Sequence, residues 1–135
     1  MTLLTVVLGV AGLLVAVQLG LRWKARSMLG RPLPPLPGPL GARVAASPRA
    51  LLYFFSPSCG ACTPLTPRFR ELGRHRPGIF LVDVLEETAL ARALGVMGTP
   101  SVVEVAAGRI AGYHLGGATR AVLDRLAAPG LRETP

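Results

Sequence analysis

The hydrophobic positions of the chain form one long block followed by several short ones. The long block runs from Leu3 to Leu21 and contains no charged residue. As a helix it would rise about 28 Å, close to the thickness of the hydrocarbon core of a bilayer. No basic residue precedes the block, and Arg22, Lys24 and Arg26 follow it. This pattern fits a retained transmembrane anchor at residues 1–23 better than a cleaved signal peptide.

The stretch that follows the anchor, residues 24–42, is first basic and then rich in proline. Five prolines fall within the eight residues from Pro32 to Pro39. Proline lacks a backbone N–H and fixes φ, so we expect an extended, semi-rigid spacer here and neither helix nor sheet. The expected organisation is therefore an anchor, a linker at 24–42, a folded domain at 43–130 and a tail at 131–135.

The short hydrophobic blocks of the domain alternate with helical patterns. Strands are expected at residues 50–55, 79–84, 101–106 and 109–114, and helices at 60–74, at 86–94 and from a capping Thr119 to just before Pro129. In the second helical pattern, Leu85, Ala89, Ala93 and Leu94 share one side. Ala107-Gly108 predicts a tight hairpin between the last two strands. This order predicts an α/β domain with parallel strands first and an antiparallel hairpin afterwards.

The formal net charge of +8 divides evenly between the two parts of the chain. Four basic residues lie beside the anchor, and from Arg43 onward eleven arginines face seven acids. These arginines are scattered and no aromatic residues interleave with them, so we do not expect a nucleic-acid partner. Because the basic cluster lies only on the C-terminal side of the anchor, the positive-inside rule places the domain in the cytoplasm.

The candidate chemistry lies at Cys59-Gly60-Ala61-Cys62, which holds the only two cysteines of the chain. A structural zinc site needs about four ligands, and the chain adds only His75 and His114 to the two thiols. A c-type haem needs histidine directly after the second cysteine, where Thr63 stands. We therefore expect no metal and a redox dithiol between a strand and a helix, where a thiolate is favoured.

The domain resembles the thioredoxin family over nearly its whole length. Tyr53 to Cys62 stands where that family has its strand, aromatic turn and active site. Pro67 matches the proline that kinks the family's active-site helix, and Gly95 to Pro100 resembles its G-V-x-x-x-P segment. Gly108 matches the hairpin glycine and Gly116 the glycine near the end of the last strand.

The resemblance implies a thioredoxin-like three-layer fold, a central mixed sheet with helices on both faces, preceded here by the transmembrane helix. It implies that Cys59 is the exposed nucleophile and Cys62 the more buried resolving thiol, with no cofactor beyond their disulfide. Pro100 would be a cis-proline, and the Thr99 backbone beside it would bind the substrate chain. Gly60 and Ala61 would contact substrate as well. Pro67, Gly98 and Gly116 would support the site.

Several positions depart from the family's pattern. Tyr53 stands where the family commonly has a buried acid, and Leu81 where a lysine often accompanies it. Asp83, Glu86 or Glu87 could then be substitute proton acceptors, and His114 could approach the dithiol. Ser58 replaces the usual tryptophan before Cys59, and Ala61 the usual proline. We expect slower reduction than in a general thioredoxin, an intermediate potential and a narrower substrate range.

The sequence thus predicts a membrane-tethered thiol–disulfide oxidoreductase with a Cys-Gly-Ala-Cys dithiol. Its partners would be a protein disulfide or dithiol client, the membrane and an unidentified electron donor. Two alternatives remain: a metallochaperone that holds a soft metal such as Cu(I), and an assembly factor for a single client. We expect a single-pass protein of a bacterial cell membrane. Because anchored members of the family often face outward, an extracytoplasmic domain stays open beside the cytoplasmic one.

Overall fold

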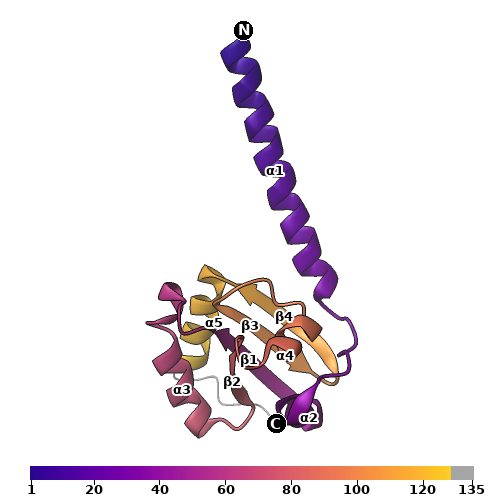
Figure 1. The fold of residues 1–135 in the computed structure, drawn as a ribbon, viewed down its shortest axis with the longest axis vertical. Helices are drawn as coiled ribbons and strands as arrows, with labels where there is room; N and C mark the ends of the chain where they lie inside the picture. The colour runs from indigo at the N-terminus through magenta and orange to yellow at the C-terminus, as the bar shows by residue number, and fades with distance from the viewer. Residues whose placement is uncertain (129–135) are drawn as a thin grey trace.

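The computed structural model of this chain describes residues 1–128. A long helix, α1 (Thr2–Met28), stands clear of a folded domain (Figure 1). Its segment Thr2–Lys24 has a mean hydropathy of 2.3, no part of it is buried against the protein, and it is long and apolar enough to cross a membrane. The expected tail at 131–135 lies outside the described residues.

The centre of the domain is a four-stranded mixed sheet. The strands are β1 (Arg49–Phe55), β2 (Ile79–Asp83), β3 (Ser101–Ala106) and β4 (Arg109–Leu115), in the order β2-β1-β3-β4. β1 runs parallel to β2 and antiparallel to β3, which is antiparallel to β4. The hairpin between β3 and β4 has positive φ at Ala107 and Gly108, as a tight two-residue turn requires. The predicted arrangement, with parallel strands first and an antiparallel hairpin afterwards, is confirmed.

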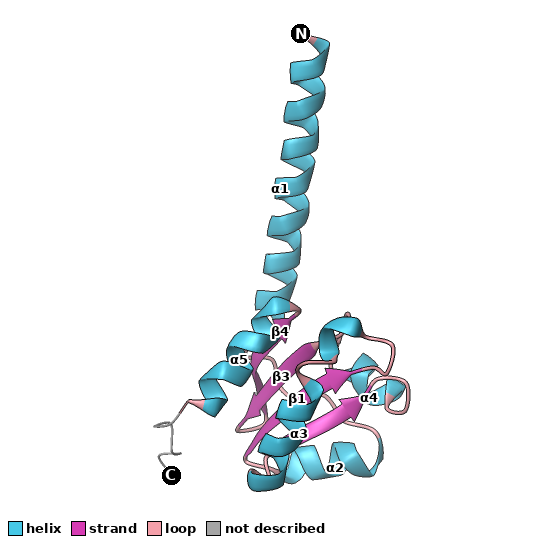
Figure 2. Cartoon of the chain, turned by 90° about the vertical axis from the view of Figure 1, so that its left-hand side faces the viewer, coloured by secondary structure: helices cyan, strands magenta, loops and turns pink. Residues whose placement is uncertain are grey.

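Helices cover both faces of this sheet, because side chains of a strand point alternately to its two sides. Leu51 and Tyr53 of β1 pack with α3 (Thr66–His75) and α5 (Gly117–Ala127). Leu52 and Phe54 pack on the other face with α2 (Gly38–Ala46) and α4 (Thr88–Ala93). In Figure 2 the strands spread across the view, with α3 in front of them. The expected three-layer architecture after one long apolar helix is confirmed.

Three helix boundaries differ from the prediction. The helix expected at 60–74 is divided into a 3₁₀ turn, Gly60–Cys62, and α3, which begins at Thr66. Pro64 lacks the N–H that a continuous helix would need there. Thr119 does not cap the last helix, since α5 begins at Gly117 and Thr119 is buried within it. Leu85 precedes α4 and is 67% exposed, so it does not join that helix's packed side.

The linker also differs from the expected extended, semi-rigid spacer. Residues 38–46 form α2, in which Pro39 occupies the first turn, where its missing N–H would have no partner anyway. Leu33, Leu36 and Leu40 pack against the buried core. Gly41 is buried and packs tightly against Leu36, because an added Cβ would lie 2.8 Å from the Leu36 backbone. The second half of the predicted linker is therefore part of the domain.

The first half of the proline-rich stretch is bonded to the sheet. The Gly30 amide donates to the Ile110 carbonyl at 2.7 Å, and the Ile110 amide donates to the Arg31 carbonyl at 3.0 Å. The Leu33 amide donates to the Gly108 carbonyl at 2.8 Å. Residues Gly30–Leu33, called here the edge segment, thus lie antiparallel along β4. They connect α1 to the domain through defined hydrogen bonds.

Candidate active site

The two cysteines lie where the chain leaves β1, and they are joined in a disulfide with their Cα atoms 5.3 Å apart. Cys59 is partly exposed, whereas Cys62 is only 2% exposed. The two sulfurs therefore differ in access to a partner. This is the asymmetry expected of an attacking and a resolving thiol.

Local backbone geometry presents an N–H group to the Cys59 sulfur. Cys59 has extended φ and ψ of −81° and 105° and precedes the 3₁₀ turn, and its Sγ accepts from the Cys62 amide at 3.2 Å. A donor at this distance stabilises negative charge on sulfur, which favours a thiolate at Cys59. Gly60 and Ala61 are exposed beside it, so a bound chain can reach the sulfur without displacing a large side chain.

The loop before β3 meets the dithiol at the same end of the sheet. Phe54 pairs with Ser101, so Thr99 and Pro100 leave the sheet beside the start of the cysteine turn. The Thr99–Pro100 peptide bond is cis, as predicted. The Pro100 carbonyl accepts from the Gly116 amide at 2.9 Å, and the Ser101 hydroxyl donates to the Gly98 carbonyl. These bonds fix the loop on either side of Thr99.

The Thr99 backbone is available for a partner chain. Within residues 1–128, neither its N–H nor its carbonyl has a hydrogen-bond partner in the protein. An extended chain could therefore add to this edge through main-chain hydrogen bonds. Gly116 has a φ of 63°, which suits glycine, and its N–H donates to the Pro100 carbonyl.

The comparison with protein families decides which family this architecture belongs to. The family model named Thioredoxin matches residues 41–128, which include the dithiol and the cis-proline loop. The chain belongs to the thioredoxin family. A comparison with curated proteins gave no match.

Solved thioredoxins resemble the chain in structure. A Schistosoma mansoni thioredoxin is 26% identical with a TM-score of 0.56, the match covering 66% of this chain and 85% of that one. A mutant thioredoxin of Halobacterium salinarum NRC-1 is 26% identical with a TM-score of 0.54, covering 67% and 84%. Oxidized mitochondrial thioredoxin 3 of Saccharomyces cerevisiae, at 21% identity and a TM-score of 0.50 over 62% and 80%, supports the fold alone. A thioredoxin fold with a C-x-x-C dithiol supports thiol–disulfide oxidoreductase chemistry in general.

Pro67 takes a different place from the kinking proline that the thioredoxin resemblance implied. It is exposed and lies in the first turn of α3, because the helix begins at Thr66. A proline there removes no intrahelical hydrogen bond, so it helps to start the helix and does not bend its interior. Gly98 lies in the loop before Pro100, and an added Cβ there would lie 3.8 Å from the Leu115 side chain.

The most consequential departure from the thioredoxin pattern is at Tyr53. Its side chain is fully buried and stacks on Phe69 with ring centroids 4.1 Å apart. Its hydroxyl lies 2.9 Å from the Thr66 hydroxyl, which donates to the Cys62 carbonyl at 3.0 Å. Because the Thr66 hydroxyl donates its hydrogen to the Cys62 carbonyl, the Tyr53 hydroxyl is the donor in its hydrogen bond with Thr66. The sequence pointed to Tyr53 but gave no sign of Thr66, which is thirteen residues away.

This hydrogen-bonded chain contains no base for the Cys62 proton. Burial raises the pKa of Tyr53 above its ordinary value of 10.0, and the hydrogen bond with Thr66 offsets only part of that effect. Tyr53 therefore stays neutral at physiological pH. The buried position that carries an acid in many thioredoxins carries a proton donor here.

The other candidate proton acceptors have different contacts. The Asp83 carboxylate accepts from the Leu85 amide at 2.9 Å and shapes the loop after β2. The His114 ring lies 3.6 Å from the Glu104 carboxylate, which also binds Arg125 at 2.5 Å. Among the described residues, the buried Nε2 of His114 has no hydrogen-bond partner, and the charged group beside it is Glu104 of β3.

A cavity of about 360 Å³ lies at the opposite end of the sheet, where Arg49, Gly78, Ala106 and Leu126 contribute to its wall. It does not belong to the dithiol site. Among the described residues, no three His, Cys, Asp or Glu side chains gather as metal ligands would. The dithiol with its cis-proline loop is therefore the candidate site.

Proposed function

We propose that this protein is a membrane-tethered thiol–disulfide oxidoreductase that exchanges disulfides with client proteins. One observation carries the proposal: the partly exposed Cys59 is bonded to the buried Cys62, beside a loop whose Thr99 backbone is free to bind a chain. A thiol partner can approach one sulfur and is kept from the other.

The chemistry is a two-step exchange. The Cys59 thiolate attacks one sulfur of a client disulfide, forming a mixed disulfide and releasing one client thiolate. The Cys62 thiolate then attacks the Cys59 sulfur, which closes the Cys59–Cys62 disulfide and releases the second client thiolate. Two electrons pass to the client, and a donor dithiol returns them to the enzyme. The reverse sequence oxidises a client dithiol, and neither direction needs a further cofactor.

The tether is α1, and the basic residues that follow it indicate which side carries the domain. Arg22, Lys24 and Arg26 succeed the apolar segment and none precedes it, which favours a cytoplasmic domain by the positive-inside rule. A reporter enzyme fused after Pro135 tests this side. Activity that needs an extracytoplasmic location would place the domain outside and would favour oxidation over reduction of clients.

The exchange itself is tested with the full-length protein in nanodiscs and a disulfide-bonded peptide. Cys62→Ser should accumulate a mixed disulfide at Cys59, which non-reducing electrophoresis and mass spectrometry detect. Cys59→Ser should form none, because the buried Cys62 cannot reach the peptide. If Cys59→Ser turned the peptide over as fast as the wild type, the redox proposal would be wrong.

A Cu(I) titration separates this function from the metallochaperone alternative. The oxidoreductase should turn over the peptide disulfide with a dithiol donor and bind Cu(I) no more tightly than an ordinary dithiol peptide. Tight one-to-one Cu(I) binding together with absent turnover would replace the proposal with metal transfer.

A further inference from the structure

The edge segment holds the domain in a defined orientation beneath α1. Only Leu29 separates the end of α1 at Met28 from the first residue bonded to the sheet. Besides the three backbone bonds to β4, the Arg109 guanidinium donates to the Gly30 carbonyl at 3.0 Å. A domain fixed this closely to its anchor cannot sample all directions, as one on a free polar linker would.

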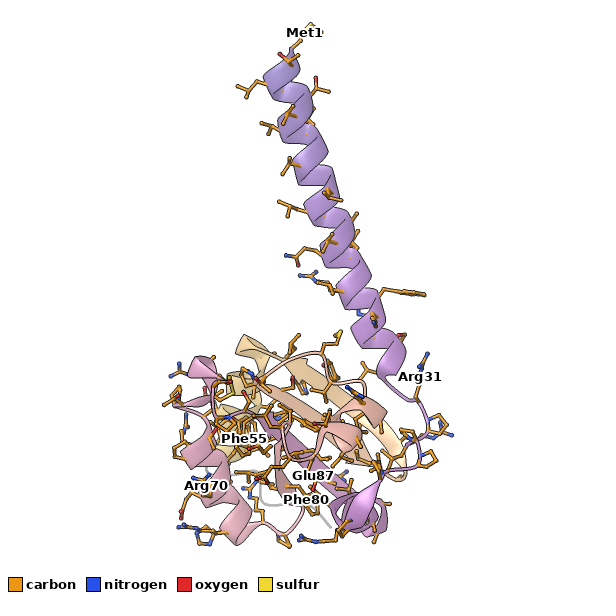
Figure 3. The ribbon with its side chains drawn as sticks, viewed as in Figure 1. Met1, Arg31, Phe55, Arg70, Phe80 and Glu87 are labelled. Carbon is orange, nitrogen blue, oxygen red and sulfur yellow. A yellow bond between two sulfur atoms is a disulfide. The ribbon has the colours of Figure 1, made fainter. Side chains whose placement is uncertain are left out.

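This orientation places the dithiol on the side of the domain from which α1 rises. β1 and β4 are both antiparallel to β3, so their carboxyl ends lie at the same end of the sheet. Figures 1 and 2 show that this end lies on the side of the domain from which α1 rises. Figure 3 likewise places Phe55, the last residue of β1, nearer that side than Phe80 at the start of β2. Cys59 follows Phe55 after only three residues.

The distance to the bilayer is short. Trp23 suits the membrane interface, and the five residue steps from Trp23 to Met28 rise only about 8 Å in a helix. We call the end of the domain that carries Cys59, Cys62 and the cis-proline loop the redox pole. With Trp23 at the interface, the redox pole would lie near the lipid headgroups. The Ala107-Gly108 hairpin lies at the opposite end of the sheet.

An independent observation concerns exposed apolar side chains. Beyond α1, the large apolar side chains exposed in the described residues are Leu29, Leu85, Met97 and Leu115, at 45%, 67%, 46% and 43%. Leu29 adjoins the anchor. Leu85 follows β2, Met97 precedes the cis-proline and Leu115 ends β4. All three therefore lie at the redox pole. Apolar surface concentrated around a reactive site indicates a surface that binds a partner.

We propose that the redox pole faces the bilayer and acts on disulfides or dithiols of membrane proteins, at the point where their chains leave the same membrane. This inference rests on the proposed function and names its client class. The client's cysteine would reach Cys59 in an extended segment, with apolar residues against Leu85, Met97 and Leu115. Soluble proteins would have to enter the narrow space between the domain and the lipid.

The orientation is tested by fluorescence in nanodiscs that carry an energy-transfer acceptor on their lipid headgroups. One variant has Cys62→Ser with a donor dye on Cys59. The matched control has both cysteines changed to serine and Ala107→Cys in the exposed hairpin, carrying the same dye. The dye on Cys59 should transfer energy more efficiently than the dye on residue 107. Equal or reversed efficiencies would overturn the orientation.

The client class is tested with one disulfide peptide, either free or attached to the nanodisc through an acyl chain. A flexible insertion of Gly and Ser between Leu29 and Gly30 keeps the edge segment bonded but releases the domain from α1. We expect this insertion to increase the rate of reduction of the free peptide several-fold. The rate of reduction of the attached peptide should not increase. Unchanged rates on both peptides would overturn the proposal. Absence of any mixed disulfide in the uninserted protein carrying Cys62→Ser would instead refute the oxidoreductase function, while the dye experiment still reports the orientation.

Discussion

Replacing Tyr53 by phenylalanine tests the interpretation of the buried position beneath the dithiol. The substitution removes one hydroxyl and keeps the ring that stacks on Phe69. In the variant, the Thr66 hydroxyl still donates to the Cys62 carbonyl. It loses only the hydrogen bond that it accepts from Tyr53. A net hydrogen bond is worth about 1 kcal/mol, so Tyr53→Phe should lower the free energy of unfolding by about that amount near neutral pH.

This difference should depend on pH in a defined direction. Below about pH 10 Tyr53 is neutral in both the folded and the unfolded chain, so its full contribution is present. Above that value the unfolded chain loses the proton first, because burial raises the pKa of Tyr53 in the fold. The stability of the wild type therefore falls as pH rises through the folded-state pKa. Phenylalanine has no such proton, and other titrating groups are common to both proteins.

The measurement is chemical unfolding of both oxidised full-length proteins in micelles, followed by circular dichroism. The wild type should be the more stable near pH 8. Its advantage should shrink or reverse near pH 11, because each pH unit between the unfolded-state and the folded-state pKa lowers its stability by roughly 1.4 kcal/mol. An advantage that persists or grows at high pH would show that burial does not hold Tyr53 neutral.

The same pair of proteins tests the chemistry. Because neutral Tyr53 is no base at physiological pH, Tyr53→Phe should leave the rate of mixed-disulfide resolution by Cys62 within about threefold of the wild type. Stopped-flow release of a fluorescent thiol from Cys59 measures this rate. A tenfold fall would mean that the hydroxyl takes part in proton transfer, which would refute the role assigned to it.

Three further substitutions have defined outcomes. Phe69→Ala removes a fully buried ring and should cost about 3–5 kcal/mol by urea unfolding, with the exposed Arg70→Ala as a control expected near zero. Gly41→Ala would place a Cβ 2.8 Å from backbone atoms of Leu36, so it should lower the melting temperature by several degrees, although alanine normally favours a helix. Ser101→Ala removes the hydroxyl that donates to the carbonyl of the cis-proline loop, and should cost about 1 kcal/mol and slow mixed-disulfide formation. A Gly41→Ala protein at least as stable as the wild type, or unchanged exchange by Ser101→Ala, would contradict the packing described for each.

The sheet and the dithiol could be predicted because their signals are local. The run that becomes β1 is apolar on both faces, and both of its faces are indeed covered by helices. Cys59 and Cys62 lie three residues apart after that strand, and the spacing to Pro100 follows a family pattern. Each of these expectations needed only residue type and order along the chain.

The remaining features depend on contacts between distant residues. Pro32 to Pro39 has the local preferences of an extended spacer, and nothing nearby in sequence indicates that Leu33 and Leu36 would pack on the core or that Gly30 would bond to Ile110. The hydrogen bond between Tyr53 and Thr66 could not be predicted either, because it joins residues that are distant in sequence. It depends on where α3 begins, and the break at Pro64 moved that start from the predicted residue 60 to Thr66.

The edge segment also affects whether the domain stays monomeric when it is separated from α1. β4 is an outer strand of the sheet, and such a strand offers unpaired N–H and carbonyl groups to any other extended chain. Gly30–Leu33 pair with part of the outer side of β4. Pro32 in this segment has no N–H that could bond to a further strand. Cutting the chain at Gly38 to obtain a soluble domain would uncover the outer side of β4. We expect such a fragment to self-associate through strand pairing, whereas one cut at Leu29 should stay monomeric in gel filtration.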